Sequence, residues 1–364
     1  MDKLSGKMKA VVFAGGVGTR MWPLSRVSTP KQFESIVGKK STLQLTIERI
    51  RPEFNWQDIY ISTGERYKNK IKKQLPRIPK QNIISEPARR DVAGAVGYMV
   101  GILAKQDPDQ PIVILWSDHL MEKVEVFKKV LKIGAEYINK HKDKFLFIGQ
   151  RPRFANENLG WIRMGKQVEK INGFYIHQFK NWKYRPGAKL AERFFKSKYY
   201  VWNPGYWIVT PHFILQQYKQ FMPKMYKKIK KLQESYGTSR WEKDFKKIYP
   251  TFEKISFDDA ILEKIESEKA VVLPADFGWS DIGTWQALKE ALQKNEEDNV
   301  LKGKVLQEKC QDCLIYNYNN KQLLTVISLQ GLVIVNTKDA LLAVSYTHLR
   351  AHETSLHLVC RLLL

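Results

Sequence analysis

The sequence predicts an α/β protein with a mostly parallel central sheet, followed by a small all-β domain. Short apolar runs recur through the first half of the chain, and stretches with helical periodicity lie between them. From about residue 299, short alternating segments follow one another without intervening helices. Strands that alternate with helices form parallel sheets buried on both faces, and 364 residues are more than one compact core usually holds.

The apolar runs and the helical stretches define the elements of the first domain. Ligands of parallel α/β sheets bind at the carboxyl ends of the strands, so the loops after Ala14, Ser85 and Trp116 are the expected places for chemistry. The expected strands cover residues 9–14, 58–62, 82–85, 112–116 and 145–149, and the expected helices cover residues 43–50, 91–104 and 123–139.

The chain divides into three parts by pattern. Residues 1–295 form the expected catalytic domain, and residues 296–344 form the small β domain, for which a β-helix, here truncated, and a sandwich both remain open. Residues 345–364 hold three of the seven histidines and no lysine, although the preceding chain is rich in lysine. We interpret this last segment as a non-native or chimeric tail, with a His/Cys metal site as the alternative.

Composition excludes several classes of protein. With 43% hydrophobic and 27% charged residues the chain is globular rather than disordered. No apolar run reaches about 18 residues, and the N-terminus lacks an apolar signal core. We therefore expect a cytoplasmic protein with no membrane partner.

The chain is strongly basic, with a net charge of +24 from 61 basic and 37 acidic residues. A nucleic-acid partner is one explanation, but the lysines are scattered and no nucleic-acid motif is present, which favours weak steering of anionic substrates. Cys310 and Cys313 form a single CxxC without the two further ligands that a zinc ribbon needs. We expect neither nucleic-acid binding nor zinc.

A glycine-rich segment, AGGVGTRMWPLSRVSTPKQF at residues 14–33, follows the first expected strand; we call it the signature loop. Its glycines let the backbone approach a phosphate and present N–H groups to the oxygens. Arg20 and Lys31 supply the positive charge that a triphosphate needs, and two prolines stiffen the loop. Neither a GxGxxG opening a helix nor a GK[ST] phosphate loop is present.

The signature loop resembles that of the sugar-1-phosphate nucleotidyltransferases, and its WPLS and PKQF segments resemble the mannose-1-phosphate guanylyltransferase branch in particular. The likeness runs to about Val344. It implies a Rossmann-like, GT-A-like sheet, Mg²⁺ as cofactor, and the reaction of GTP with mannose 1-phosphate to GDP-mannose and pyrophosphate. Another sugar 1-phosphate, or a catalytically weak relative that binds nucleotide sugars, remains an alternative, and the oligomeric state stays open, with a homodimer as one outcome.

The resemblance also assigns roles to residues. Glu86 lies in Glu-Pro-Ala-Arg-Arg-Asp and can accept hydrogen bonds from a guanine edge, although Asp91 stands where the family has Asn. The implied catalytic residues are Arg20 and Lys31, and the implied nucleotide-binding residues are Gly15, Gly16, Gly18, Thr19, Glu86 and Arg90.

Two acids match the metal ligands of the family. Asp118 lies in Ser-Asp-His after an expected strand, and Asp281 lies in GWSDIGTW. A strand-end Asp is otherwise often a helix cap. Mg²⁺ takes carboxylate and phosphate oxygens at about 2.1 Å, so we expect the two carboxylates within roughly 4–7 Å of each other, mutually repelling until metal binds.

The sugar side departs from the family pattern. Asn203 in Trp-Asn-Pro-Gly can donate to and accept from sugar hydroxyls, and Arg185 can meet a phosphate, but the acid that precedes it in the family is Tyr184 here. Asp258 matches a sugar-contacting acid of the family, but it is equally well explained as a negative charge that stabilises the N-terminus of a helix. The implied sugar-binding residues are Gly160, Arg185, Asn203 and Asp258.

Overall fold

The computed structural model describes residues 3–16 and 18–346, and these form two compact units. The sheet unit is built from residues up to 15, 47–117 and 121–279. The coil unit is built from residues 16–46, 118–120 and the chain from 280 onward. This division differs from the expected boundary at residue 295, because most of the signature loop and both candidate metal ligands belong with the C-terminal strands.

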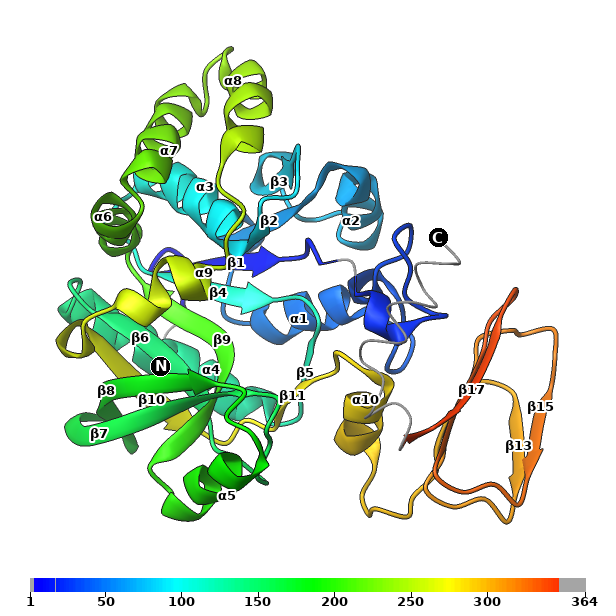
Figure 1. The fold of residues 1–364 in the computed structure, drawn as a ribbon. Coiled ribbons are helices and arrows are strands. Elements are labelled where there is room, and N and C mark those ends of the chain that lie inside the picture. The colour runs from blue at the N-terminus through cyan, green and yellow to red at the C-terminus, as the bar shows by residue number, and fades with distance from the viewer. Residues whose placement is uncertain (1–2, 17, 347–364) are drawn as a thin grey trace. The chain divides into compact units, whose positions relative to one another are not determined.

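The sheet unit is organised around nine strands in the order β3-β2-β1-β4-β9-β6-β10-β8-β7 (Figure 1). The pairs β1–β2, β1–β4, β2–β3 and β6–β10 are parallel, which confirms the mostly parallel α/β fold. Strand β9 lies antiparallel between β4 and β6, and β7 and β8 close one edge as an antiparallel pair. The strands are β1 (Lys9–Phe13), β2 (Ile59–Gly64), β3 (Ile83–Glu86), β4 (Ile112–Trp116), β6 (Phe145–Gln150), β7 (Gly160–Ile171), β8 (Phe174–Tyr184), β9 (Tyr200–Val209) and β10 (Ala270–Ala275).

Helix α3 (Asp91–Gln106) is almost wholly apolar because it is covered on all sides. Its residues 93–104 are buried, and α6, α7 and α9 contact it as well as the sheet core. A Cβ at Gly97 or Gly101 would lie 2.7 or 2.9 Å from the Ile229 side chain, so these glycines set how closely α7 packs on α3. No helix of the described residues is long and apolar enough to cross a membrane.

The other helices pack on the sheet or on one another, and α8 lies beside α7 (Figure 1). Helix α4 contacts β6, β9 and β10. The remaining helices are α1 (Thr42–Ile50), α2 (Lys68–Gln74), α4 (Val124–Lys140), α5 (Ala188–Ser197), α6 (Pro211–Phe221), α7 (Pro223–Ser235), α8 (Trp241–Ile248), α9 (Phe257–Ala260) and, in the coil unit, α10 (Trp285–Leu292).

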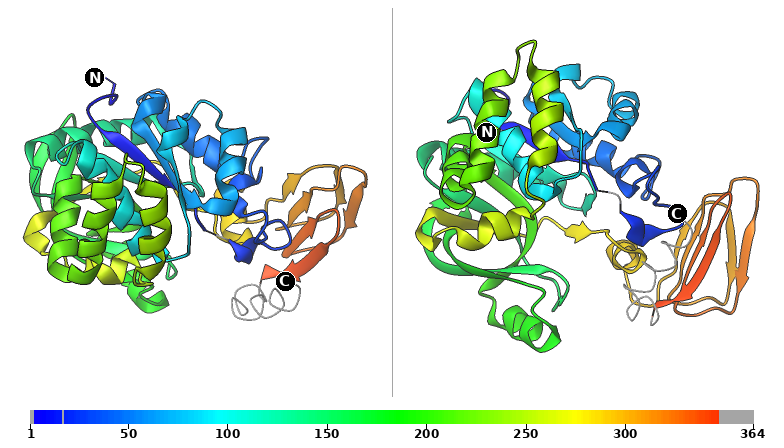
Figure 2. Two further views of the ribbon diagram at one scale, coloured as in Figure 1. Left: turned by 90° about the horizontal axis from the view of Figure 1, so that it is seen from above. Right: turned by 45° about the horizontal axis from the view of Figure 1, so that its top comes forward.

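The C-terminal strands of the coil unit form a parallel β-coil (Figure 2). Strands β12 to β16 alternate between two sheets, ordered β12-β14-β16-β17 and β13-β15, and every pair except β16–β17 is parallel. Of the two alternatives, the structure therefore has the β-helix-like one. The strands are β12 (Val300–Lys302), β13 (Val305–Glu308), β14 (Leu314–Asn317), β15 (Leu324–Ile327), β16 (Leu332–Asn336) and β17 (Leu341–Ser345).

The end of the β-coil overlaps the expected tail by two residues. Ser345 pairs with Leu332 as part of β17, and the Tyr346 amide donates to the Gly331 carbonyl at 3.1 Å. Both residues therefore belong to the β-coil, and the rest of the expected tail, residues 347–364, lies outside the described residues. Cys310 and Cys313 are both free thiols in the β-coil, with Cys313 buried.

Candidate active site

One lysine ammonium joins two of the candidate acids within the coil unit. Lys31 Nζ lies 2.8 Å from Asp118 Oδ2 and 4.0 Å from Asp281 Oδ1. Because the two oxygens can be no farther apart than the sum of these distances, they lie within about 7 Å of each other. The expected proximity of Asp118 and Asp281 is therefore found, although they are far apart in sequence.

The ammonium changes the expected electrostatics of this pair. Two carboxylates alone would repel each other, but the Lys31 ammonium, whose side chain is only 7% exposed, lies between them and offsets one of their two negative charges. Burial alone would raise the pKa of Asp118, but the Lys31 ammonium and then His119 hold that pKa well below its usual range. The protein's own cation thus reduces the repulsion between the two acids.

The signature loop holds Lys31 by local contacts. Lys31 begins the short 3₁₀-helix Lys31–Phe33, and its amide donates to Ser25 Oγ at 3.1 Å. Gly18 has φ +61, and a Cβ there would lie 2.9 Å from Lys31 Cγ, so the loop passes directly against the lysine stem. Gln32 is buried, and its side-chain amide donates to the Gly16 carbonyl at 2.7 Å.

Arg20 lies close to the second acid. A Cβ built at Gly283 would lie 3.1 Å from Arg20 Nη2 and 3.0 Å from Asp281 Oδ1, so glycine leaves room for both groups. Asp281 ends the short strand β11 (Trp279–Asp281), which pairs with β5 (His119–Met121) just after Asp118. The coil unit thus brings together Arg20, Lys31, Asp118 and Asp281.

The donor set around Lys31 suits a hard cation that also binds phosphate. Two carboxylates converge at a position that already accepts one positive charge. Mg²⁺ is usually held by one or two carboxylates, with phosphate oxygens and water completing its shell. No cluster of three His, Cys, Asp or Glu side chains suited to a metal occurs in the described residues.

In the sheet unit, Glu86 ends β3 within a chain of hydroxyl groups. Ser62 Oγ donates to Glu86 Oε1 at 3.0 Å, the Tyr249 hydroxyl donates to Oε2, and Tyr98 donates to Ser62 Oγ at 2.7 Å. A Cβ at Gly15 would lie 3.6 Å from Oε1, so the start of the signature loop passes beside this carboxylate. Burial raises the pKa of Glu86 to about 7.

Arg90 and Asp91 form the N-terminal end of α3. Arg90 is the N-cap residue, and its buried Nε has no hydrogen-bond partner among the described residues. Asp91 adopts φ +62, a left-handed conformation that Asn and Asp tolerate best, and its Oδ1 accepts the Val92 amide at 2.8 Å. The departure from the family's Asn at this position is therefore sterically permitted.

The candidate sugar-binding residues differ from one another in their structural surroundings, and Asn203 is held by the backbone of its own strand. Asn203 sits in a bulge of β9, where Tyr206 and Trp202 pair with Ile148 and Gln150 of β6, and its Oδ1 accepts the Gly205 amide at 2.9 Å. This bulge is what accommodates Pro204 inside a strand. Asn203 therefore has a structural role as well as the implied one.

Three other candidates flank this region of the sheet unit. Gly160 begins β7, and a Cβ there would lie 3.4 Å from Asn203 Cβ, so these two are neighbours. Arg185 is exposed, and its guanidinium lies 5.3 Å from the Tyr184 ring centroid. Asp258 lies in the first turn of α9, as the structural alternative predicted, and burial raises its pKa.

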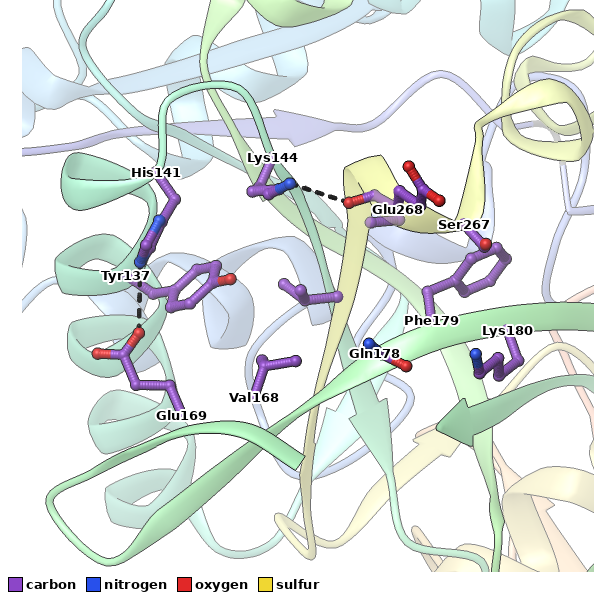
Figure 3. A pocket seen from close by; sticks show the side chains of 12 residues that line it. Tyr137, His141, Lys144, Val168, Glu169, Gln178, Phe179, Lys180, Ser267 and Glu268 are labelled. Atoms are coloured by element: carbon purple, nitrogen blue, oxygen red, sulfur yellow. Dashed lines mark hydrogen bonds and ion pairs between the residues drawn. The ribbon is translucent and has the colours of Figure 1, made fainter. Parts of the chain in front are cut away.

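A cavity of about 440 Å³ in the sheet unit is lined by none of the candidate residues (Figure 3). It opens near the amino ends of β6 and β10, opposite the edge where α/β sheets bind ligands. Its polar groups satisfy one another: His141 pairs with Glu169 at 3.3 Å, and Lys144 donates to the Glu268 carbonyl at 2.9 Å. We do not assign this cavity to the active site.

The structure also reveals residues that sequence reasoning missed. Gln150 is fully buried at the end of β6; its amide donates to Asp276 Oδ1 at 2.9 Å, and its Oε1 accepts the amides of Phe277 and Trp279. It thereby shapes the chain that leads into Asp281. The only sequence signal was a glutamine at the end of an apolar strand, and nothing local marked Tyr249 as the partner of Glu86.

Comparison with known proteins gives a consistent result. A model of the nucleotidyl transferase family matches residues 9–298. Mannose-1-phosphate guanylyltransferase RfbM of Salmonella typhimurium strain LT2 is 32% identical over 341 residues, which is 91% of this chain and 68% of that protein. Mannose-1-phosphate guanylyltransferase 2 of Escherichia coli O157:H7 is 32% identical over 347 residues, which is 92% of this chain and 69% of that protein.

A solved structure extends the likeness to the β-coil. A Thermus thermophilus protein described as a mannose-1-phosphate geranyltransferase is 25% identical and superposes with a TM-score of 0.85, covering 98% of this chain and 100% of that one. The family match spans most of the chain, and the relatives are matched over more than two thirds of their length. The chain therefore belongs to the nucleotidyl transferase family, within its mannose-1-phosphate guanylyltransferases.

Proposed function

We propose that the protein transfers a guanylyl group from GTP to mannose 1-phosphate, giving GDP-mannose and pyrophosphate. The observation that carries this proposal is the convergence of Asp118, Asp281 and Lys31 beside the signature loop. A triphosphate needs dense positive charge, and the transfer of its α-phosphoryl group depends mainly on positioning and charge neutralisation. Family membership and the names of the relatives support the same reaction.

The reaction needs no covalent intermediate. A phosphate oxygen of mannose 1-phosphate attacks the α-phosphorus in line, a new O–P bond forms, and the bond to the β-phosphate oxygen breaks to release pyrophosphate. The attacking oxygen is already ionised, so no general base is required. Lys31 and Arg20 neutralise charge that develops on the phosphoryl oxygens, and the amides of Gly16, Gly18 and Thr19 bind the triphosphate.

Members of this family generally use a divalent metal ion, and we propose Mg²⁺ for this chain. Asp118 and Asp281 would hold it together with phosphate oxygens, and the metal would add positive charge at the α-phosphate. Lys31, which lies 2.8 Å from Asp118 and 4.0 Å from Asp281, would add its own positive charge beside these carboxylates and contribute to phosphate binding.

Residues of the sheet unit would recognise the rest of the substrates. The Glu86 carboxylate would accept hydrogen bonds from guanine N1–H and N2–H₂, with Gly15 leaving the approach open, and Arg90 would bind phosphate. The sugar 1-phosphate would contact Gly160, Arg185, Asn203 and Asp258, as the family resemblance implies. Two of these, Asn203 and Asp258, also have the structural roles described above.

GTP is expected to be the preferred nucleotide. Pyrophosphate release should be measured with each of the four nucleoside triphosphates against mannose 1-phosphate and several other sugar 1-phosphates. We expect the highest kcat/KM for GTP with mannose 1-phosphate, because the signature loop matches this branch and Glu86 accepts the guanine donors. Equal rates with UTP or dTTP would contradict the guanine assignment, and no pyrophosphate in any combination would favour a relative that only binds.

The affinity for GTP is expected to fall below pH 7. Burial raises the pKa of Glu86 from 4.5 to about 7, and only the ionised carboxylate accepts both guanine donors. The KM for GTP should therefore rise about tenfold between pH 8 and pH 6, because the ionised fraction falls by about that factor. The phosphates of the substrates titrate in the same pH range, so Glu86→Gln is the control. The KM of this variant for GTP should still change with pH through the phosphates, but it should lack the part of the change that comes from Glu86.

The same pKa shift affects stability in a defined direction. The folded protein holds the Glu86 proton up to about pH 7, whereas the unfolded chain releases it near pH 4.5. This contribution to the free energy of unfolding is therefore full below pH 4.5 and is lost as the pH rises through 7, and it amounts to about 3 kcal/mol. A urea titration of wild type and Glu86→Gln across this range isolates it.

A further inference from the structure

Apolar residues of the signature loop pack against one face of the β-coil. Met21 and Leu24 of the loop and Ile36 just after it belong to one apolar cluster, in which Met21 and Ile36 are fully buried. The rest of that cluster comes from α10 and the β-coil: Ile282, Trp285, Leu288, Leu314, Tyr316, Val333 and Val335. The loop therefore takes its apolar support from strands made at the other end of the chain.

Two polar contacts reinforce this packing along the loop. Trp285 Nε1 donates to the Trp22 carbonyl at 2.9 Å. Both Nη atoms of Arg26 donate to the Asp339 carboxylate, at 2.6 and 2.8 Å, while Arg26 Nε donates to the Pro23 carbonyl at 3.0 Å. Arg26 thus connects the turn at Pro23 to the segment between β16 and β17 through a bidentate contact with the Asp339 carboxylate.

The third polar contact is a lysine enclosed by backbone carbonyls. Lys302 Nζ donates to the carbonyls of Ser35, Ile36 and Gly38, the last two at 3.2 and 3.1 Å. An ammonium has three N–H donors, so three carbonyls satisfy it. The Tyr318 ring lies 5.1 Å from the same atom, and burial lowers the pKa of Lys302.

The first carbonyl that Lys302 binds, that of Ser35, belongs to a residue only four positions after Lys31 in the chain. The carbonyls that it binds follow the 3₁₀-helix Lys31–Phe33, whose orientation sets where the Lys31 side chain points. A displacement of about 1 Å at a reacting centre can cost about 10²-fold in rate. A contact that fixes the end of this helix therefore influences the geometry at Asp118 and Asp281.

We propose that the β-coil is the template on which the signature loop is held, and that Lys302 is a positioning residue that aligns Lys31 for catalysis. The proposal rests on the proposed function for its effect on turnover. Its structural part, the ordering of residues 18–38 by Lys302, stands independently of any activity.

The test compares two lysine variants, Lys302→Met and Lys289→Met. Lys289 is a matched control: its side chain is 4% exposed, and it binds Asp312, Gln293 Oε1 and the Glu296 carbonyl at 3.0 Å, all outside the signature loop. Hydrogen exchange of residues 18–38, the urea midpoint, and kcat and KM for pyrophosphate release are measured on the full chain for both variants.

We expect Lys302→Met to increase exchange in residues 18–38 and to lower kcat by about 10-fold or more, with a smaller change in the KM for mannose 1-phosphate. Lys289→Met should lower the urea midpoint at least as much and leave both loop exchange and kcat near wild type. Lys302→Arg should not restore kcat, because a planar guanidinium does not match three carbonyls arranged around a compact ammonium.

Equal losses of kcat in the two lysine variants, or unchanged loop exchange in Lys302→Met, would overturn the proposal. If Lys302→Met does not fold, Asp339→Asn replaces it: removing this exposed partner of Arg26 should raise loop exchange and lower kcat several-fold at an unchanged midpoint, and unaltered exchange would count against the template. If the wild-type protein releases no pyrophosphate, the proposed function fails while loop exchange still decides the structural part.

Discussion

Replacing Lys31 with alanine is expected to lower kcat for pyrophosphate release by roughly 10²-fold or more. A preorganised cation that stabilises developing charge is typically worth about 3 kcal/mol. Lys31 is preorganised in this sense, because Ser25 accepts its amide and Gly18 packs on its stem. Pyrophosphate release from GTP and mannose 1-phosphate, under saturating substrate, measures the effect.

Two companion variants separate charge from packing. Lys31→Met keeps most of the apolar stem against Gly18 and removes only the ammonium, so its kcat should be as low as that of Lys31→Ala. Lys39→Ala removes an exposed lysine from the same segment and should leave kcat unchanged. Wild-type kcat in a folded Lys31→Met protein would show that the ammonium serves structure alone.

Asp118→Asn and Asp281→Asn are each expected to abolish Mg²⁺-dependent turnover, but with different effects on stability. Asp118 is the 2.8 Å partner of a lysine that is 7% exposed, so its loss leaves a buried ammonium with only the more distant Asp281 carboxylate, at 4.0 Å, and the Ile282 carbonyl, at 3.5 Å. Breaking a fully buried pair costs about 3–5 kcal/mol, and the cost should be smaller here because Asp118 is 27% exposed. Asp281 is 35% exposed and 4.0 Å from the ammonium, which is an interaction worth about 0–1 kcal/mol.

The measurement is turnover as a function of Mg²⁺ concentration, with urea unfolding run in parallel. Asp118→Asn should lower the urea midpoint clearly, and Asp281→Asn should barely move it. Asp109→Asn, which removes a surface acid 3.8 Å from Lys142, serves as the control with normal turnover and stability. Persistent Mg²⁺-dependent turnover in either active-site variant would contradict the assignment of that residue as a metal ligand.

The sequence predicted the parallel part of the sheet well, because that part has strong local signals. Strands β1, β2, β3, β4 and β6 lie within one or two residues of the five apolar runs. The loops after β1 and β4 carry the glycine loop and Asp118, and Glu86 is the last residue of β3. Apolar runs bounded by turn residues specify such strands without reference to the rest of the chain.

The antiparallel strand β9 was not predictable in the same way. Its segment YVWNPGYWIV contains Pro204 and Gly205, which ordinarily argue against a strand, and it forms one only because a bulge against β6 accommodates them. Its place between β4 and β6 depends on pairing between residues far apart in sequence. No local pattern encodes that order.

The candidate site shows the same limit. Sequence reasoning assigned Lys31 to the triphosphate and the two acids to the metal, but it did not anticipate that the lysine pairs with Asp118. Burial raises the pKa of Glu86, and the Tyr249 hydroxyl that donates to its carboxylate comes from a distant part of the chain. Residue types reveal which chemistry is available, while tertiary packing decides which charges compensate one another.

The assembly of the coil unit from distant segments has a consequence for synthesis on the ribosome. The loop residues Met21 and Leu24 emerge early, whereas Val333 and Val335, which bury them, are made about 300 residues later. At about 5–20 residues per second, the nascent loop waits roughly 15–60 s for its core. All strands of the sheet unit, which end with β10 at Ala275, are therefore made before the loop's apolar core is available, and the loop can pack only after Val335 has been made.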